Sequence, residues 1–425
     1  MGAQYFNASI ETMSPEERTA FQLKALRDLL KYTYARCSGV KEKFDAAGIR
    51  PADIRMLEGL QRVPLTTKDE LRRLQEKNPP FGGFLSIPMQ DVETIYCSPG
   101  PIFEPQDPSD AFWARLLKCL HATGVGRGDI ITCTLSYHLV PAGLWLHTAA
   151  RRLGATAVPA GPGNTELQVR ILHDLGVTAY IGTPSFLYTL ITKAQEMGYD
   201  FHKQFRLRKA LTTAEMLSPS MRATLESYGV DIIQSYGTAD VGLFAYECRH
   251  KNGFHMCEET IIEILDPVTK TRLGPGEVGE IVVTTLDVRV YPWIRFATGD
   301  LSLYTEEPCP CGRTSNRLVK IVGRVGEAAK IRGMFVHPKQ VDEVMSRFPI
   351  ISRWTVLVTR PGQRDELTLK VELDQGAGDV AQIREGILSK FPELCHLRPD
   401  SVEFVPLGSI PDDQVKKVVD KRVWK

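Results

Sequence analysis

The sequence predicts an α/β protein of two domains. We expect a large N-terminal domain of mostly parallel sheets packed with helices plus a β-rich subdomain, and a small hinged α+β C-terminal domain. The length of 425 residues exceeds one ordinary domain. Short apolar runs alternate with helical stretches from about residue 110 to 290. A glycine-bearing break at Gly323-Arg324-Val325-Gly326 then places the domains at 1–323 and 324–425.

The first long element is an amphipathic helix. Ser14-Pro15-Glu16-Glu17 has the form of a capping box with proline at the first helical position. Apolar side chains recur at helical spacing behind it as far as Tyr34. The elements predicted after it are strands at 130–135, 155–159 and 179–182, helices at 145–153 and 167–175, and hairpin-like strands at 276–286 and 302–304.

The last hundred residues mix both element types. Helical spacing favours helices at 340–348 and 382–391. Alternating apolar residues favour strands at 355–359, 367–373 and 401–405. This pattern is typical of a small α+β domain.

The composition excludes several classes of function. Because 52 basic side chains oppose 51 acidic ones, the chain has no charge signature for nucleic acid or an anionic membrane. There is no apolar run long enough to cross a bilayer, and the first residues lack a secretory pattern. Nine cysteines, an odd number, fit a reducing compartment. We therefore expect a cytoplasmic protein, with a homodimer as its commonest assembly.

Four residues are candidate ligands of a structural Zn²⁺, because thiolates and imidazole are its preferred donors: Cys248, His255, Cys309 and Cys311. The last two cysteines flank a single proline, so both sulfurs can turn toward one point. Asn252-Gly253 is a turn signal that could fold the histidine back toward the first cysteine. Cys257 is an alternative ligand to His255. A closed site of this kind would join two loops and perform no chemistry.

Several motifs in a fixed order identify a known family. They are Val63-Pro64-Leu65-Thr66-Thr67-Lys68-Asp69-Glu70-Leu71-Arg72, Gly182-Thr183-Pro184-Ser185, Tyr236-Gly237-Thr238-Ala239-Asp240-Val241-Gly242, Ala245-Tyr246-Glu247-Cys248, Thr298-Gly299-Asp300-Leu301, Cys309-Pro310-Cys311-Gly312-Arg313 and Ile331-Arg332-Gly333-Met334-Phe335-Val336-His337-Pro338. Their order and spacing resemble the phenylacetate-CoA ligases of the adenylate-forming superfamily. Some members of that family bind zinc with this cysteine and histidine arrangement.

The resemblance implies a two-step reaction on a small aromatic acid. The acid's carboxylate attacks the α-phosphate of ATP to give an acyl-adenylate and pyrophosphate. The thiol of coenzyme A, or of an acyl carrier protein, then displaces AMP. In the family the C-terminal domain rotates between the steps, which suits the glycine-bearing junction.

The resemblance also implies roles for individual residues. Tyr236 would stack on adenine, and the same pocket would include Ala214, Glu215, Ser235 and Gly237. Thr238 would reach a phosphate, and Asp240 stands where the family has a glutamate that binds Mg²⁺. Asp300 would bind the ribose hydroxyls, and Arg324 ribose or phosphate. Tyr137 and His138 fall beside the expected position of the substrate ring.

The phosphate loop departs from the family pattern. The family reads Ser-Ser-Gly-Thr-Thr-Gly-Lys-Pro, and this chain reads Ser98-Pro99-Gly100-Pro101-Ile102-Phe103-Glu104-Pro105. Ser98 and Gly100 are kept, but two prolines remove N–H donors and Glu104 replaces the lysine. A phosphate cradle needs free N–H groups and positive charge, so the loop is predicted to bind triphosphate poorly.

A second departure lies near the C-terminus. Gln414 occupies the position of the family's adenylation lysine, and Lys416 could replace that lysine only in a shifted register. Loss of the lysine would slow adenylation specifically, because its charge stabilises that transition state. Two alternatives to the ligase therefore stay open: an ATP-independent acyl transferase or hydrolase on the same fold, and a non-catalytic AMP- or acyl-binding protein.

Overall fold

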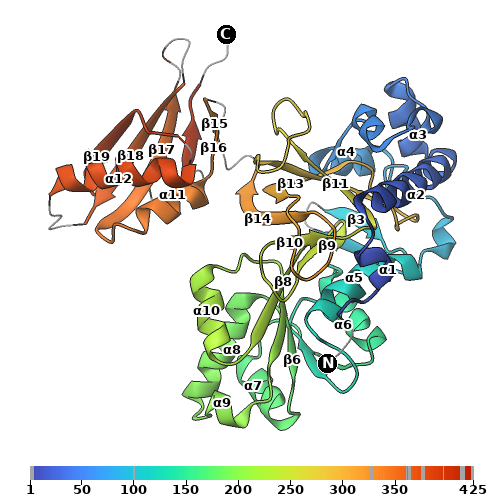
Figure 1. The fold of residues 1–425 in the computed structure, drawn as a ribbon, viewed down its shortest axis with the longest axis horizontal. Coiled ribbons are helices and arrows are strands. Elements are labelled where there is room, and N and C mark those ends of the chain that lie inside the picture. Colours follow the sequence, from blue (N-terminus) through green and yellow to red (C-terminus); the bar gives the residue numbers. More distant parts are fainter. Residues whose placement is uncertain are drawn as a thin grey trace.

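The computed structural model describes residues 4–98, 101–325, 329–332, 334–359, 361, 365–374, 379–395, 397–411 and 417–422. A large N-terminal part and a smaller C-terminal part lie side by side (Figure 1). This arrangement agrees with the predicted fold class. The boundary after residue 323 stays a prediction.

Helices cover the large part on several sides. α2 (Pro15–Arg36) begins at the predicted capping box, where Glu17 N donates to the Ser14 hydroxyl. Because its buried leucines lie on one face, α2 packs into the main core together with α3 (Ser38–Ala46). The other helices of this part are α1 (Ala8–Glu11), α4 (Lys68–Lys77), α5 (Asp110–Ala122), α6 (Ala142–Arg152), α7 (Thr165–Asp174), α8 (Pro184–Glu196), α9 (Phe201–Gln204) and α10 (Pro219–Ser227). Short 3-10 turns cover Pro51–Asp53, Leu57–Arg62 and Met89–Asp91.

One twelve-stranded sheet forms the centre, in the order β11-β12-β13-β14-β10-β9-β8-β7-β6-β4-β5, with β1 beside β13. Its parallel half is β4 (Ile130–Cys133), β5 (Thr156–Pro159), β6 (Ala179–Gly182), β7 (Lys209–Thr212) and β8 (Asp231–Thr238). Its antiparallel half is β9 (Gly242–Glu247), β10 (Phe254–Met256), β11 (Thr260–Leu265), β12 (Gly279–Thr285), β13 (Phe296–Thr305) and β14 (Arg317–Arg324). β1 (Thr66–Thr67) runs parallel to β13. The predicted strand and hairpin regions are all present.

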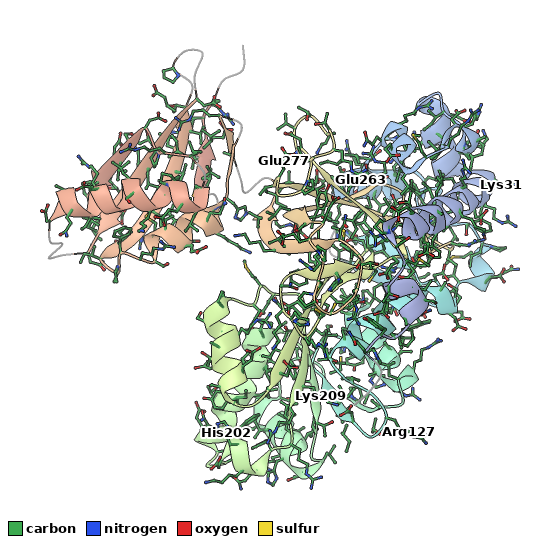
Figure 2. All side chains as sticks on the ribbon, viewed as in Figure 1. Lys31, Arg127, His202, Lys209, Glu263 and Glu277 are labelled. Carbon is green, nitrogen blue, oxygen red and sulfur yellow. The ribbon has the colours of Figure 1, made fainter. Side chains whose placement is uncertain are left out.

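The parallel strands end at one edge of the sheet. Gly182, Thr212 and Thr238 are the last residues of β6, β7 and β8, so the loops that follow them converge there. At the opposite edge, Lys209 begins β7 and lies 2.9 Å from an Asp129 carboxylate oxygen (Figure 2). Thr238 therefore lies at the carboxyl edge, and Ala214 and Glu215 follow β7 there, whereas Asp300 and Arg324 belong to β13 and β14.

The C-terminal part has its own core. Its sheet has the order β19-β18-β17-β20 and carries α11 (Pro338–Met345) and α12 (Val380–Cys395). The strands are β17 (Ile351–Thr359), β18 (Glu366–Leu373), β19 (Ser401–Val405) and β20 (Val418–Asp420), and a separate ribbon joins β15 (Ala329–Ile331) to β16 (Met334–Val336). In the described ranges, no helix is both long enough and apolar enough to cross a membrane.

Candidate nucleotide site and metal cluster

Two predicted nucleotide residues meet directly. Tyr236, near the end of β8, donates from its hydroxyl to Asp300 Oδ2 on β13 at 2.8 Å. Burial and the charge of Asp300 raise the pKa of Tyr236 well above its ordinary value, so the hydroxyl keeps its proton. Asp300 also donates its backbone N–H to the Thr298 hydroxyl at 3.1 Å. The two side chains are therefore in direct contact, and their role in binding a nucleotide stays a prediction.

Arg324 extends this pair toward the C-terminal part. Its Nε lies 3.2 Å from Asp300 Oδ1, and the two residues face each other in the β13–β14 register. The Arg324 side chain is 61% exposed, so its guanidinium stays available from solvent. Tyr236, Asp300 and Arg324 are thus linked in series by a hydrogen bond and an ion pair, and Arg324 is the last residue of β14.

His337 links the end of β14 to the C-terminal part, and no role was predicted for it from the sequence. The fully buried imidazole accepts from Arg324 N at Nε2 (3.1 Å), while Lys339 N lies 3.2 Å from Nδ1. A neutral imidazole has one acceptor nitrogen, so only one amide is fully bonded in each tautomer. At Gly323 a Cβ would lie 1.8 Å from Nε2, so only glycine leaves room for the ring.

The turn between β8 and β9 carries the predicted phosphate and Mg²⁺ residues. Val241 N donates to the Thr238 hydroxyl at 3.2 Å, which closes the turn. Gly237 permits close strand packing, because a Cβ there would lie 2.2 Å from Gly242 O. Buried Arg115 donates from Nη1 to the carbonyls of Val241 and Leu243, at 3.0 Å each. No sequence signal pointed to Arg115, since its partners, these carbonyls and the Asp287 carboxylate at 2.7 Å from Nε, lie far along the chain.

The altered phosphate loop belongs to a hairpin of β2 (Ile95–Ser98) and β3 (Ile102–Pro105). Buried Gln75, on α4, holds this hairpin: its Nε2 donates to Phe103 O at 2.7 Å, and Phe103 N donates to its Oε1 at 2.9 Å. The Phe103 amide is therefore not free for a phosphate. Gly100, predicted as part of the loop, lies outside the described residues.

Glu104 points into the protein beside Asp240. Ser98 Oγ donates to Glu104 Oε1 at 3.1 Å, and Lys68 Nζ lies 3.3 Å from Asp240 Oδ1. Burial, together with the adjacent charge of Asp240, raises the pKa of Glu104 to about 9. The sequence predicted a repelling charge in the loop, and the structure adds that this carboxyl is desolvated and contacts the expected Mg²⁺ residue. Asp240 is thus placed to supply a carboxylate oxygen, the donor type that Mg²⁺ prefers.

The other predicted residues are more scattered. Ser235 is buried within β8, whereas Ala214 and Glu215 are exposed, with Ala214 at φ +66°. Tyr137 is half-buried and its hydroxyl lies 3.2 Å from His147 Nδ1, while His138 is exposed. Gln414 and Lys416 lie outside the described residues.

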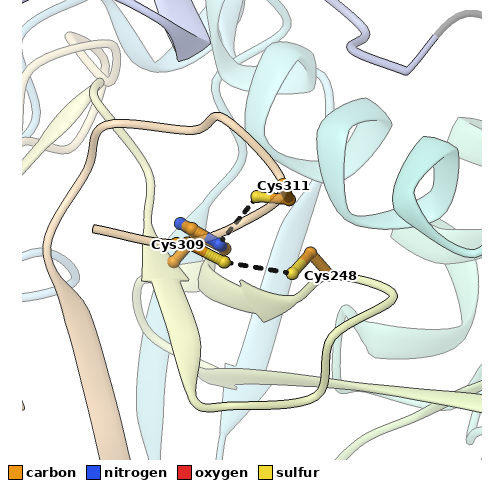
Figure 3. Close-up of side chains that lie close together, drawn as sticks. Cys248, Cys309 and Cys311 are labelled. Carbon is orange, nitrogen blue, oxygen red and sulfur yellow. Dashed lines mark hydrogen bonds between the residues drawn. The ribbon is translucent and has the colours of Figure 1, made fainter. Parts of the chain in front are cut away.

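The four candidate zinc ligands converge. The ligand atoms of Cys248, His255, Cys309 and Cys311 lie within 4.8 Å of one another, and all four residues are buried. Cys248 Sγ is 3.7 Å from Cys309 Sγ, and Cys311 Sγ is 3.4 Å from His255 Nε2 (Figure 3). Hydrogen bonds from Cys248 and His255 lower the pKa of Cys311 to about 2, which favours its thiolate.

The geometry also separates the two candidate ligands that the sequence left open. His255 Nδ1 lies 3.3 Å from the Ser315 hydroxyl, which orients the ring with Nε2 toward the sulfurs. Cys257 lies outside the cluster, in the apolar core with Cys119. Burial, with Cys119 beside it, raises the pKa of Cys257 well above its ordinary value. The donor set is therefore three thiols and one imidazole, which fits a closed tetrahedral Zn²⁺ site.

Comparisons with known proteins agree with this architecture. The AMP-binding enzyme family model matches residues 110–288, and the model for its C-terminal domain matches 333–422. The phenylacetate-coenzyme A ligase of Thermus thermophilus is 33% identical over 87% of this chain and 84% of its own. The Escherichia coli enzyme of that name is 33% identical over 97% of each chain.

Solved structures show the same two-part arrangement. An open conformation of 2-hydroxyisobutyryl-CoA ligase, in complex with 2-HIB-AMP and CoA, superposes with a TM-score of 0.91 at 25% identity, covering 99% of this chain and 95% of that one. The structure of the same ligase in its thioesterification state superposes with a lower TM-score, 0.74. The two parts of this chain are therefore arranged as in the open form. From these relatives, the chain belongs to the phenylacetate-coenzyme A ligase family, whose members are AMP-forming acid–thiol ligases.

Proposed function

We propose that this chain joins an aromatic carboxylic acid to coenzyme A through an acyl-adenylate. The contact of Tyr236 with Asp300, extended by Arg324, is the observation that carries this proposal. A protonated phenol beside a carboxylate offers a ring face for adenine and acceptor oxygens for ribose hydroxyls. Tyr236 lies near the carboxyl end of the parallel strand β8. Ligands of open α/β sheets bind at the carboxyl ends of such strands.

In the first step, an oxygen of the acid attacks the α-phosphorus and the bond to pyrophosphate breaks. Thr238 stands at the turn to donate its hydroxyl to a phosphate oxygen. Asp240 would hold Mg²⁺, which neutralises phosphate charge when bound. In the second step, the thiol sulfur attacks the acyl carbon, and AMP leaves with the bonding electron pair. We favour coenzyme A over a carrier protein as the acceptor, because the relatives named above are coenzyme A ligases.

The acid is proposed to be aromatic because of the curated relatives and Tyr137. The relatives are named for phenylacetate. The Tyr137 ring is half-buried and hydrogen-bonded to His147, so it offers one apolar face and one polar edge. The exposed side chain of His138 gives it no comparable part in the proposed pocket.

The experiment is isotope exchange between pyrophosphate and ATP, run with a panel of aromatic acids. Exchange that depends on one acid supports the proposal. Exchange with none of the acids would reject the ATP-dependent reaction. AMP binding is followed in parallel by calorimetry, and binding without any turnover would indicate a non-catalytic binding protein.

A second candidate function has its own supporting observation. Gln75 occupies the Phe103 amide, and the buried carboxyl of Glu104 stands in the sequence position of the family's lysine. Both features favour an enzyme that receives an acyl group already activated and transfers or hydrolyses it without ATP. Product formed from a supplied acyl-adenylate or acyl-CoA with ATP omitted supports this candidate, provided that the exchange reaction is silent.

We further propose that the cysteine cluster holds one structural Zn²⁺. The convergence of three thiols and an imidazole in a buried site supports it. Metal analysis of the purified protein tests it, with one equivalent of zinc expected. A protein that folds normally at zero equivalents would overturn this proposal.

A further inference from the structure

A buried ion pair adjoins the turn between β8 and β9. Arg115, on α5, has a side chain that is 1% exposed, and Asp287, in the connection between β12 and β13, has one that is 3% exposed. Arg115 Nε lies 2.7 Å from Asp287 Oδ2. Removing two charges from water costs free energy that their mutual attraction often fails to offset, so stability alone does not explain such a pair.

The guanidinium is directed mainly at the turn. Arg115 Nη1 lies 3.0 Å from the carbonyl oxygens of both Val241 and Leu243, which flank Gly242. An Nη nitrogen carries two hydrogens, so both are used on the turn. The stronger contact with a carboxylate is bidentate, but within the described residues Arg115 Nη2 and Asp287 Oδ1 have no hydrogen-bond partner. The guanidinium therefore makes a single contact with Asp287 and keeps two donors for backbone carbonyls.

The same turn carries the two side chains that are proposed to act on phosphate and Mg²⁺. Val241 N donates to the Thr238 hydroxyl at 3.2 Å, and Asp240 directly precedes Val241. Because the hydroxyl oxygen accepts from Val241, its own hydrogen is left to donate to another acceptor. A displacement of Val241 would therefore change both the direction of this hydroxyl and the position of the Asp240 carboxylate.

We propose that Arg115, oriented by Asp287, is a positioning residue for adenylation, which holds the turn so that Thr238 and Asp240 meet the phosphates of the nucleotide. The inference rests on the proposed function for the reaction, and on the contacts of Arg115 alone for the support of the turn. Small displacements of positioning groups slow the reacting step, and an interaction made only in the transition state lowers kcat without raising KM.

The double variant Arg115→Met/Asp287→Leu separates positioning from stability. Replacing both partners of a buried pair by apolar side chains leaves no charge unpaired, so the thermal midpoint should stay close to that of the wild type. The turn carbonyls nevertheless lose their donor. We expect kcat for acid-dependent pyrophosphate exchange to fall about 10-fold to 100-fold, with little change in the KM of the acid. Hydrogen exchange at the turn amides, followed by mass spectrometry, should become faster.

Lys118→Met is the matched control, because Lys118 is a second buried cation one helical turn further along α5. Its ammonium lies 2.8 Å from a Glu259 oxygen and also contacts Glu258. Its loss leaves two carboxylates without their cation, so the thermal midpoint should fall while kcat and the hydrogen exchange of the turn stay as in the wild type. Glu277→Gln, in the connection between β11 and β12, is a surface control that should change none of these measurements (Figure 2).

Two results would overturn the proposal. One is wild-type kcat together with wild-type hydrogen exchange in the double variant. The other is an equal loss of kcat in Lys118→Met, because the effect would then follow stability. Arg115→Lys keeps a charge beside Asp287 but lacks the planar fork, so it decides the question if the double variant folds poorly: a lowered kcat supports the proposal and an unchanged kcat overturns it.

Failure of the proposed function is a separate result. If the wild type shows no pyrophosphate exchange with any acid, the role of Arg115 in adenylation is overturned together with that function. Faster hydrogen exchange of the turn in Arg115→Met/Asp287→Leu would then still establish that the guanidinium supports the turn.

Discussion

The cysteine cluster and the phosphate hairpin show two ways in which a site depends on sequence. In the cluster, the chemistry resides in side chains, and the four residues singled out by type do converge. In the hairpin, the chemistry of a phosphate cradle resides in backbone amides, and Gln75 occupies one of them. Residue types in the sequence were therefore enough to predict that the four residues of the cluster converge. The bonding of the hairpin amide could be seen only in the folded structure. Substitutions in these two sites, and at Asp300 and Gly323, test how far each contact depends on one residue.

The largest effect is expected from Cys309→Ser. Loss of one thiolate from a closed site leaves the others without their common metal, so we expect the free energy of unfolding to fall by about 3 kcal/mol or more. Zinc content and the thermal midpoint measure it. Cys257→Ser is the matched control, because that buried thiol lies outside the cluster and should leave zinc content at one equivalent. Equal zinc loss in both variants would contradict the assigned ligand set.

Asp300→Ala should have the next largest effect. It removes the acceptor of the Tyr236 hydroxyl and the partner of Arg324. A lost hydrogen bond to a charged group corresponds to roughly 10-fold to 100-fold weaker AMP binding. Calorimetric titration with AMP measures it, with Glu277→Gln as the control. Unchanged AMP affinity in Asp300→Ala would place the nucleotide elsewhere.

Gly323→Ala tests the contact between the end of β14 and His337. The added Cβ would occupy the position of the His337 ring, so the imidazole must leave the Arg324 amide. Because small displacements of positioning groups slow catalysis, we expect about tenfold slower thioester formation. Single-turnover assays separate this step from pyrophosphate exchange. Gly126→Ala, where a Cβ would meet nothing within 4 Å, should behave as wild type.

The smallest effect concerns stability and pH. In the folded protein the pKa of Glu104 is raised to about 9 from its ordinary 4.5, so folding favours the protonated carboxyl. Its contribution is fully favourable below about pH 4.5 and is lost as pH rises toward 9. Glu104→Gln mimics the protonated acid, so without divalent metal its thermal midpoint should exceed that of wild type by about 2–4 °C at pH 8, and by less at pH 5. A difference that does not depend on pH would contradict this assignment.

Much of the fold could be predicted from short strands with clear ends. Ala179–Gly182 and Ser401–Val405 have the predicted bounds, because each is an apolar or alternating run between clear breaks. The helix predicted from residue 145 begins earlier, at Ala142, where Pro141 precedes its first turn. Element ends depend on local capping, which apolar periodicity does not report.

The candidate site was predicted in part for a related reason. Tyr236 and Asp300 belong to motifs, and the structure brings them together. Gln75 and Arg115 belong to none of the motifs, and the motif that contains His337 gave no role for it, because the partners of these residues lie in distant segments. Such contacts arise from how strands are placed in space, and residue type gives no signal for them.

The cysteine cluster and the ion pair of Asp300 with Arg324 lie near opposite ends of the β13–β14 hairpin. Cys309 and Cys311 are in the connection between β13 and β14, and Asp300 faces Arg324 near the other end. A slip of one residue between two strands would turn every side chain to the other side of the sheet. A bound zinc ion would fasten the connection and so keep the carboxylate and guanidinium aligned at a distance. An ion that takes no part in the reaction would thereby determine whether the pocket forms in the correct register.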